Sequence, residues 1–263
     1  MSKYLVFFRA HMQTLLQYRE AAVSGAIVQI FFGLLRIFLL KAFYASSTLP
    51  PPMPFEHAVI YIWLVEATLR LAPFAPIADI VRQIRSGQVA YEWIKPMDVY
   101  FIWLSRSMAS KIAPTLLRFF PVVLISSLFF GFRAPPSGFA LIAWILSLAL
   151  AVILSAVITN LLNITLLWTI SGEGISQLMI ACSYLLSGQL IPLAIFPDAI
   201  RDLFRWLPFA GIVDLPNRFY LGELQMIDLL PAMAFQISWI VVLGVLGYGV
   251  LHFGLRKVVI QGG

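Results

Sequence analysis

Charged side chains are scarce in this sequence. Only 11% of the 263 residues are Asp, Glu, Lys or Arg, whereas soluble domains carry about 25%. A soluble protein of this length needs a polar exterior, and a sequence that is 61% hydrophobic cannot supply one. A lipid bilayer removes this requirement, because lipid tails solvate apolar side chains. The composition therefore excludes an ordinary soluble domain and predicts an integral membrane protein.

Residues and motifs that carry chemistry are also missing. The one cysteine, Cys182, lies in an apolar run, can form no intrachain disulfide, and is expected to be a packing residue. His11, His57 and His252 are far apart in the sequence, so no metal site is predicted. The GxxxxGK[ST] motif of nucleotide hydrolysis is absent. The chain is therefore expected to be non-catalytic, with no cofactor of its own.

Long apolar runs fill most of the sequence instead. Each run is continuous over about 20 residues, as a membrane-spanning helix requires, and lacks the alternation typical of a membrane β-barrel. The runs predict an all-α integral membrane fold with six transmembrane helices, forming a single transmembrane domain over residues 1–263. The expected spans are residues 21–43, 58–75, 112–130, 139–170, 175–191 and 226–251.

The formal charge of +6 does not indicate a nucleic-acid partner, because the 18 basic residues are scattered near the ends of spans. With six spans, both termini lie on one side. Ten Lys and Arg residues then fall on the side of the termini and five on the other. Basic residues favour the cytoplasmic side. We therefore expect a multi-pass protein with both termini cytoplasmic, in contact with membrane lipid and with no nucleic acid.

Two polar stretches lie on this expected cytoplasmic side. Residues 2–20 place apolar side chains near helical spacing between basic ones, which predicts an amphipathic interfacial helix. Residues 77–111 form the one sizeable basic stretch, in which a short helix can end at Gly87. This stretch is either a cytoplasmic helix that fits a groove on a motor subunit or an ordinary interfacial loop anchored by Trp93 and Lys95. Composition alone favours the loop.

Residues 192–225 form a second amphipathic segment, interrupted by prolines. The fifth span ends at Gly188 and Pro192, so the chain can turn back before crossing the bilayer fully. Such re-entrant backbone survives at membrane depth only where protein or a cavity shelters it. The segment is either an external cap over an exit path or a helix resting on the outer leaflet. The residues that we assign to the cap are Pro192, Pro197, Arg201 and Pro208.

Several charges lie within or near the expected spans. Glu66 and Arg70 are four residues apart, which predicts that they share a helix face and can pair. Arg118 is expected about two turns into the third span, and Arg36 lies within the first. Charge inside a membrane is costly and indicates function by default. The alternative is that these side chains reach the interface or form an internal structural pair.

The order of these parts resembles the membrane subunit of an ABC-2-type exporter, in the small bacterial branch with separate permease and ATPase chains. The resemblance covers nearly the whole chain, from the interfacial helix through the six spans. It rests on short motifs in a fixed order rather than on one signature. These motifs are 84–87 (IRSG), 95–96 (KP), 187–188 (SG), 191–192 (IP), 196–197 (FP), 207–209 (LPF) and the closing 261–263 (QGG).

The resemblance implies a permease subunit with no catalysis of its own. A second permease subunit, identical or homologous, would help to enclose the pathway. Two separate ATPase subunits would bind ATP and Mg²⁺, and the complex would sit in a bacterial inner membrane. The resemblance also shifts the interpretation of 77–111 from a loop to a coupling segment. The residues expected to couple to the ATPase are Asp79, Arg82, Arg85, Gly87, Glu92 and Lys95.

The functional hypothesis is therefore an ATP-driven exporter of an amphipathic or hydrophobic substrate. Its pathway is expected to use the first, second and fifth spans, with Phe31, Phe32, Trp63 and Tyr184, although these aromatics are equally consistent with packing. A proton-coupled secondary transporter, suggested by Glu66, is the alternative. No inverted repeat supports that alternative. An intramembrane transferase is disfavoured because catalytic clusters are missing.

Overall fold

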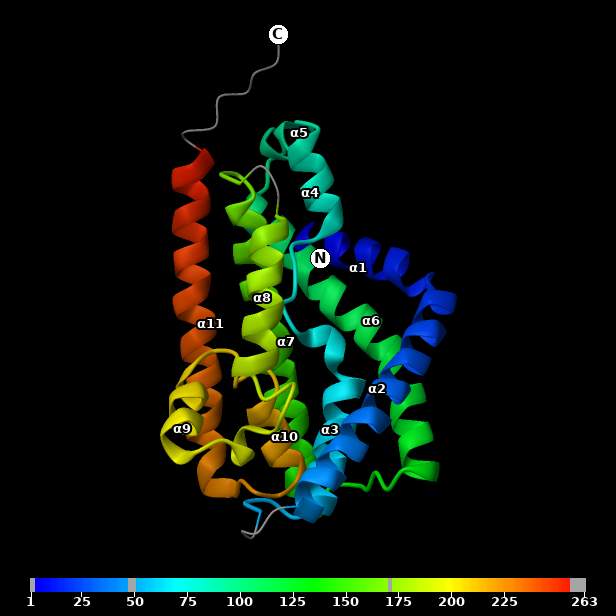
Figure 1. Cartoon of the computed structure of the whole chain (residues 1–263). Coiled ribbons are helices and arrows are strands. Elements are labelled where there is room, and N and C mark those ends of the chain that lie inside the picture. The colour runs from blue at the N-terminus through cyan, green and yellow to red at the C-terminus, as the bar shows by residue number, and fades with distance from the viewer. Residues whose placement is uncertain (1–2, 47–50, 170–171, 256–263) are drawn as a thin grey trace.

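The computed structural model describes residues 3–46, 51–169 and 172–255, and all regular secondary structure in these ranges is helical (Figure 1). The elements are α1 (Lys3–Leu16), α2 (Arg19–Ser46), α3 (Phe55–Ala67), η1 (Leu69–Leu71), α4 (Ala78–Arg85), α5 (Ala90–Trp93), α6 (Val99–Phe129), α7 (Gly138–Thr165), α8 (Glu173–Leu186), η2 (Leu193–Ile195), α9 (Asp198–Trp206), α10 (Asp214–Tyr220) and α11 (Met226–Leu255).

Four of the described helices are long and apolar enough to cross a membrane, namely α2, α6, α7 and α11. By contrast, α3 and α8 have 13 and 14 residues. At 1.5 Å per residue each is about 20 Å long, which is less than the roughly 30 Å of a hydrocarbon core. Both lie among the long helices in Figure 1. The all-helical membrane fold is confirmed, whereas the count of six spans stays a prediction.

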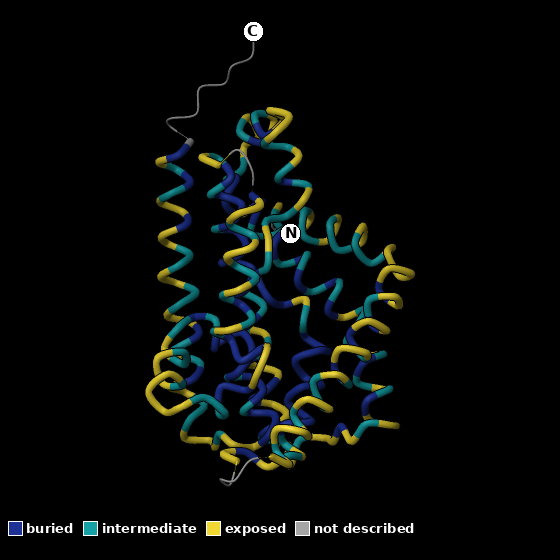
Figure 2. Tube along the Cα trace, in the orientation of Figure 1, coloured by how far each residue is buried: buried dark blue, intermediate teal, exposed yellow. Residues whose placement is uncertain are grey.

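The short helix α3 lies at the centre of the bundle. Ten of its 13 residues are buried, and it packs against α2 and α6. Trp63 is fully buried, and its indole N–H donates to the backbone oxygen of Phe130 at 3.1 Å. Gly33 of α2 leaves room for that indole, because a Cβ there would lie 2.6 Å from the Trp63 ring. Figure 2 shows the buried residues gathered in the middle and exposed residues along α2.

The third expected span begins earlier than the hydropathy indicated. α6 starts at Val99 rather than at residue 112, because the Asp98 side chain caps it by accepting a 2.8 Å hydrogen bond from the backbone N–H of Tyr100. Residues 99–111 are therefore helix and not part of a loop. Lys111 is buried within α6. Arg118 lies about five turns from the start of α6 rather than two.

The other ends also differ. α3 ends at Ala67 rather than at residue 75, and α8 ends at Leu186 rather than at residue 191. α2 extends to Ser46, and α7 ends at Thr165 rather than at residue 170. The expected helix over residues 2–20 corresponds to α1, which lies across the bundle in Figure 1 and packs against α6. Residues 170–171 and 256–263 lie outside the described residues. These include the basic pair at 256–257 and the closing motif at 261–263.

The four-residue spacing suggested a pair between Glu66 and Arg70, but Glu66 pairs with another residue. Its carboxylate lies 3.0 Å from the guanidinium of Arg36 on α2. The spacing fails because α3 ends at Ala67 and the chain continues through Thr68 into η1. Arg70 therefore does not lie on the same helix face as Glu66. The ion pair connects α2 to the end of α3.

Arg36 also holds the turn that follows α8. Its guanidinium donates to the backbone oxygen of Gln189 at 3.1 Å. Gly188, just before, has φ +81°, a conformation that favours glycine, and a Cβ there would collide with the Tyr61 hydroxyl. Arg36 thus ties α2, α3 and this turn together. The turn places the segment after α8 against the buried helix α3, so protein shelters its irregular backbone.

We expect Arg36→Met to destabilise the protein strongly, because it leaves the buried Glu66 carboxylate without a cation. Removing one partner of a buried ion pair costs about 3–5 kcal/mol. The double variant Arg36→Met/Glu66→Met removes both charges and is expected to recover much of this loss. Thermal unfolding of the detergent-solubilised chain measures both. A double variant less stable than Arg36→Met would contradict the proposed cause.

Candidate functional site

The helix α5 lies at one extreme end of the bundle, and α4 runs up to it beside the last turns of the other helices (Figure 1). We call residues 77–98 the handle. α4 is amphipathic, with Ile80 fully buried on one side. On the other side Asp79 and Arg82 form an ion pair at 2.5 Å, and Arg85 is exposed. Gly87 has φ +71° and turns the chain after α4, as its position predicted.

A buried carboxylate fixes the handle to the membrane part of the protein. Glu92 of α5 is 3% exposed and pairs with Arg106 of α6 at 2.5 Å. The indole N–H of Trp103 donates to the same carboxylate at 2.7 Å. Arg106 also donates to the Gln83 side chain of α4 at 3.0 Å. Glu92 was expected in the coupling set, and its geometry makes it an anchor rather than a docking residue.

The helix α1 supports the handle from the side. The Lys95 ammonium lies 5.4 Å from the ring centroid of Phe7. The Tyr4 hydroxyl accepts a hydrogen bond from the backbone N–H of Asp98 at 3.2 Å. These contacts reach the residues that connect α5 to α6. The handle is therefore held by α6 from beneath and by α1 at its base.

The exposed surface of the handle combines basic side chains with apolar ones. Arg82, Arg85 and Lys95 are exposed. Tyr91 and Ile94 are 69% and 77% exposed, and neither was among the residues expected to contact the ATPase. The burial of Glu92 turns the neighbouring side chains outward, and hydropathy alone carries no signal of that. Such a surface suits a groove with an apolar floor and acidic walls.

The four expected pathway aromatics do not form one cluster. Phe31 and Phe32 are 63% and 47% exposed on α2, with ring centroids 5.6 Å apart. Trp63 belongs to the buried core. Tyr184 of α8 is half-buried, stacks on Phe74, and lies with its ring centroid 6.0 Å from the Arg36 guanidinium.

An apolar cavity lies beside Arg36, between α2, α3 and the segment after α8. Its volume is about 330 Å³. Arg36 is its one charged lining residue. The aliphatic lining could not be predicted from the sequence, because runs of Leu and Ile are indistinguishable from lipid-facing surface until the helices are packed. The lining residues are Arg36, Leu39, Leu40, Phe43, Ile62, Leu190, Ile191, Pro192 and Ile195.

The segment 192–225, expected to be a cap, lies at the end of the bundle opposite the handle (Figure 1). Pro192 precedes η2, Pro197 precedes α9, and Pro208 is buried two residues after α9 ends. Arg201 pairs with Asp198 at 2.8 Å and with Asp202 at 3.5 Å. The prolines thus separate short helices.

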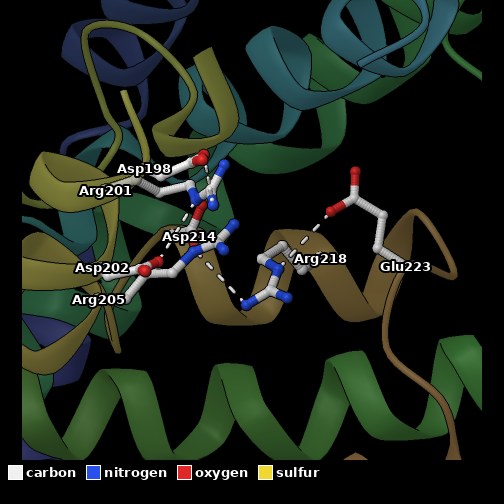
Figure 3. Close-up of polar contacts among 7 residues, drawn as sticks. All are labelled: Asp198, Arg201, Asp202, Arg205, Asp214, Arg218 and Glu223. Atoms are coloured by element: carbon white, nitrogen blue, oxygen red, sulfur yellow. Dashed lines mark ion pairs between the residues drawn. The ribbon is translucent and has the colours of Figure 1, made fainter. Parts of the chain in front are cut away.

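Asp214 is the buried centre of a charged network in this segment (Figure 3). It is 2% exposed and lies 3.5 Å from Arg205 and 4.0 Å from Arg218. Arg218 in turn lies 3.6 Å from Glu223. Burial raises the pKa of Asp214 to about 6, although both arginines act in the opposite direction. The network joins α9 to α10, which packs against α7.

The comparisons with known proteins agree with this architecture. A family model described as ABC-2 family transporter protein matches residues 30–262. No curated protein matches the sequence. The matched range includes the four long helices in large part, the handle and the segment opposite to it. The chain therefore belongs to the ABC-2 family of transporter membrane proteins.

Proposed function

We propose that this chain is the permease subunit of an ATP-driven exporter with two separate ATPase subunits, and that the handle is the docking site for an ATPase subunit. The observation that carries the proposal is a handle at one end of the bundle that exposes basic side chains and is locked to α6 by the buried pair Glu92–Arg106. A partner that pulls or pushes on the handle would move α6 with it.

Contacts at the base of the handle would carry that motion further. The backbone N–H of Ile77 donates to the Asn163 side chain of α7 at 2.8 Å. Asn163 also donates to the Ser107 hydroxyl of α6 at 3.3 Å. The handle is therefore hydrogen-bonded to two long helices. Movement of the handle would shift α6 and α7 together rather than bend a loop.

The proposed partners follow from the missing nucleotide-binding motif and from the exposed apolar surface of this chain. ATP and Mg²⁺ would be bound by the ATPase subunits, since this sequence contains no nucleotide-binding motif. A second permease subunit, identical or homologous, would cover the exposed apolar face of α2, which includes Phe31 and Phe38. The apolar cavity beside Arg36 favours an amphipathic or hydrophobic substrate. We place the complex in a bacterial inner membrane with both termini cytoplasmic.

The alternative of a proton-coupled transporter depends on Glu66. A proton carrier needs access to water during its cycle. Glu66 is 1% exposed and is held by Arg36 at 3.0 Å. This geometry favours a structural role for the carboxylate.

Co-purification tests the proposal directly. The tagged chain is extracted in mild detergent, and the eluate is analysed by mass spectrometry and assayed for ATP hydrolysis. Recovery of a Walker-motif ATPase is expected, alone or with a second permease chain. An isolated chain that transports in proteoliposomes without an ATPase would overturn the proposal.

We expect Arg85→Glu to uncouple ATP hydrolysis from transport, because it reverses the charge on an exposed docking surface. Gly87→Pro is expected to do the same, since proline cannot adopt the φ of +71° found there. Transport per ATP should fall about tenfold, which corresponds to about 1.4 kcal/mol. The control is Arg133→Glu, the same charge change at the opposite end of the bundle, which also breaks the exposed 2.7 Å ion pair of Arg133 with Glu56. Normal coupling in both handle variants would refute the docking assignment.

We expect Glu66→Gln to retain transport energised by ATP. The amide keeps nearly the shape of the carboxylate, whereas it cannot carry a proton. Transport into inverted vesicles is measured with ATP, with and without an uncoupler that collapses the proton gradient. Loss of transport in the variant, together with full inhibition of the wild type by the uncoupler, would favour the proton-coupled alternative.

A further inference from the structure

Three basic residues meet at membrane depth where α2, η1 and α6 come together. Arg70 lies in η1, three residues after α3 ends at Ala67. Lys111 and Arg118 lie on α6, about 18 and 28 Å from Val99. These positions fall within the length of the spanning helices. We call these three residues the cationic cluster.

The contacts of Lys111 and Arg118 define the geometry of the cluster. Lys111 is 6% exposed, and its ammonium donates at 2.8 Å to the backbone oxygen of Ala72, two residues after Arg70. Arg118 is seven residues after Lys111, so both leave the same face of α6. Its guanidinium covers Gly25 of α2 so closely that a Cβ there would collide with it.

No acidic residue of the described chain neutralises this cluster. None of the ion pairs in residues 3–46, 51–169 and 172–255 includes Arg70, Lys111 or Arg118. Glu66, the carboxylate nearest in sequence to Arg70, is already paired with Arg36. The positive charge of Arg70 repels the charges of both Lys111 and Arg118.

Buried polar side chains without partners mark the same place. Thr115 lies between Lys111 and Arg118 on the same face of α6 and is 8% exposed. Its hydroxyl has no hydrogen-bond partner among the described residues. Gln29 of α2 is one turn beyond Gly25, is 2% exposed, and leaves both side-chain polar atoms unpartnered within the same described ranges. Buried polar groups are normally hydrogen-bonded, so these groups indicate a missing ligand.

The chemistry of the missing ligand follows from the donors. Uncompensated cations inside a membrane are costly and are normally paired. Guanidinium groups bind phosphate and carboxylate through two parallel hydrogen bonds, and hydroxyl and amide groups can complete the shell of an oxyanion. Arg70 is exposed at the surface of the bundle, so a headgroup can reach the cluster from the side.

We propose that the cationic cluster binds the anionic headgroup of an amphiphile at membrane depth, with Arg70 and Arg118 contacting the headgroup. A phosphate on a lipid is the chemistry that fits these donors best. The amphiphile is either a transported substrate or a resident lipid. Its role as a substrate rests on the proposed export function, whereas its binding does not.

Binding is tested on the full-length chain in neutral detergent, without any ATPase. Native mass spectrometry follows titration with phosphatidylglycerol and, separately, with phosphatidylcholine of the same acyl chains. The wild type is expected to bind phosphatidylglycerol at least about tenfold more tightly, a factor typical of one charge-assisted hydrogen bond. Arg70→Gln and Arg70→Gln/Arg118→Gln should reduce this preference stepwise. Arg133→Gln removes one positive charge at the end of the bundle opposite the handle, and it should leave the preference for phosphatidylglycerol unchanged.

Equal affinity of the wild type for the two lipids would overturn the proposal, and this arm requires no variant to fold. An unchanged preference in the double variant would also overturn it. Arg70→Gln changes an exposed residue with no ion pair in the described chain, so its binding result can be read even where the double variant is unstable.

A second arm identifies the source of the headgroup. The chain with its co-purified ATPase is reconstituted with phosphatidylglycerol that carries a fluorophore on one acyl chain, and dithionite reports the fraction in the outer leaflet. An ATP-dependent change identifies a transported amphiphile. Selective binding without that change identifies a resident lipid, and both results support the headgroup site. Failure to recover an ATPase would count against the proposed function while leaving the binding result interpretable.

Discussion

The ion pair between Arg36 and Glu66 is the interaction on which the arrangement of the bundle depends. A carboxylate that is 1% exposed requires a cation, and Arg36 is the one that the fold supplies at 3.0 Å. The same guanidinium binds the backbone after α8 at Gln189. Two short segments that cannot cross a bilayer as regular helices, α3 and α8, are thereby fixed to the long helix α2. Their irregular ends are stable at membrane depth because protein surrounds them.

The handle is held by the same kind of interaction, a buried ion pair. Again a buried glutamate on a short helix pairs with an arginine on a long one, here Glu92 with Arg106. The consequence differs, because α5 lies at one extreme end of the bundle and α3 is enclosed by it. A rigid connection between the handle and α6 transmits force, whereas a flexible loop would absorb it. The anchor is therefore as important to a coupling role as the exposed basic residues.

The fold class and several local features could be predicted from the sequence. Apolar run length predicts helices such as α2 and α11, and Gly87 marks the end of α4. The start of α6 could not be predicted from hydropathy, because Arg106 and Lys111 make its first turns look polar until their partners are known. The partner of Glu66 could not be predicted either, since helical spacing favoured Arg70. Whether α3 ends before that residue is decided by packing. The exposure of Tyr91 and Ile94 likewise follows from the burial of Glu92, a tertiary contact.

Charges at membrane depth in the described chain are of two kinds, and the difference bears on mechanism. Arg36 and Glu66 neutralise each other within the chain, so their energy is fixed once the protein folds. Arg70, Lys111 and Arg118 are not neutralised there, so their energy depends on what else occupies the site. A ligand that neutralises them favours whichever conformation holds them together. Because Lys111 and Arg118 share α6 with Arg106, a helix that moves with the handle also moves this cluster. Binding of an anion and movement of the handle would then act on the same helix, and a coupled transporter requires such a connection between its two sites.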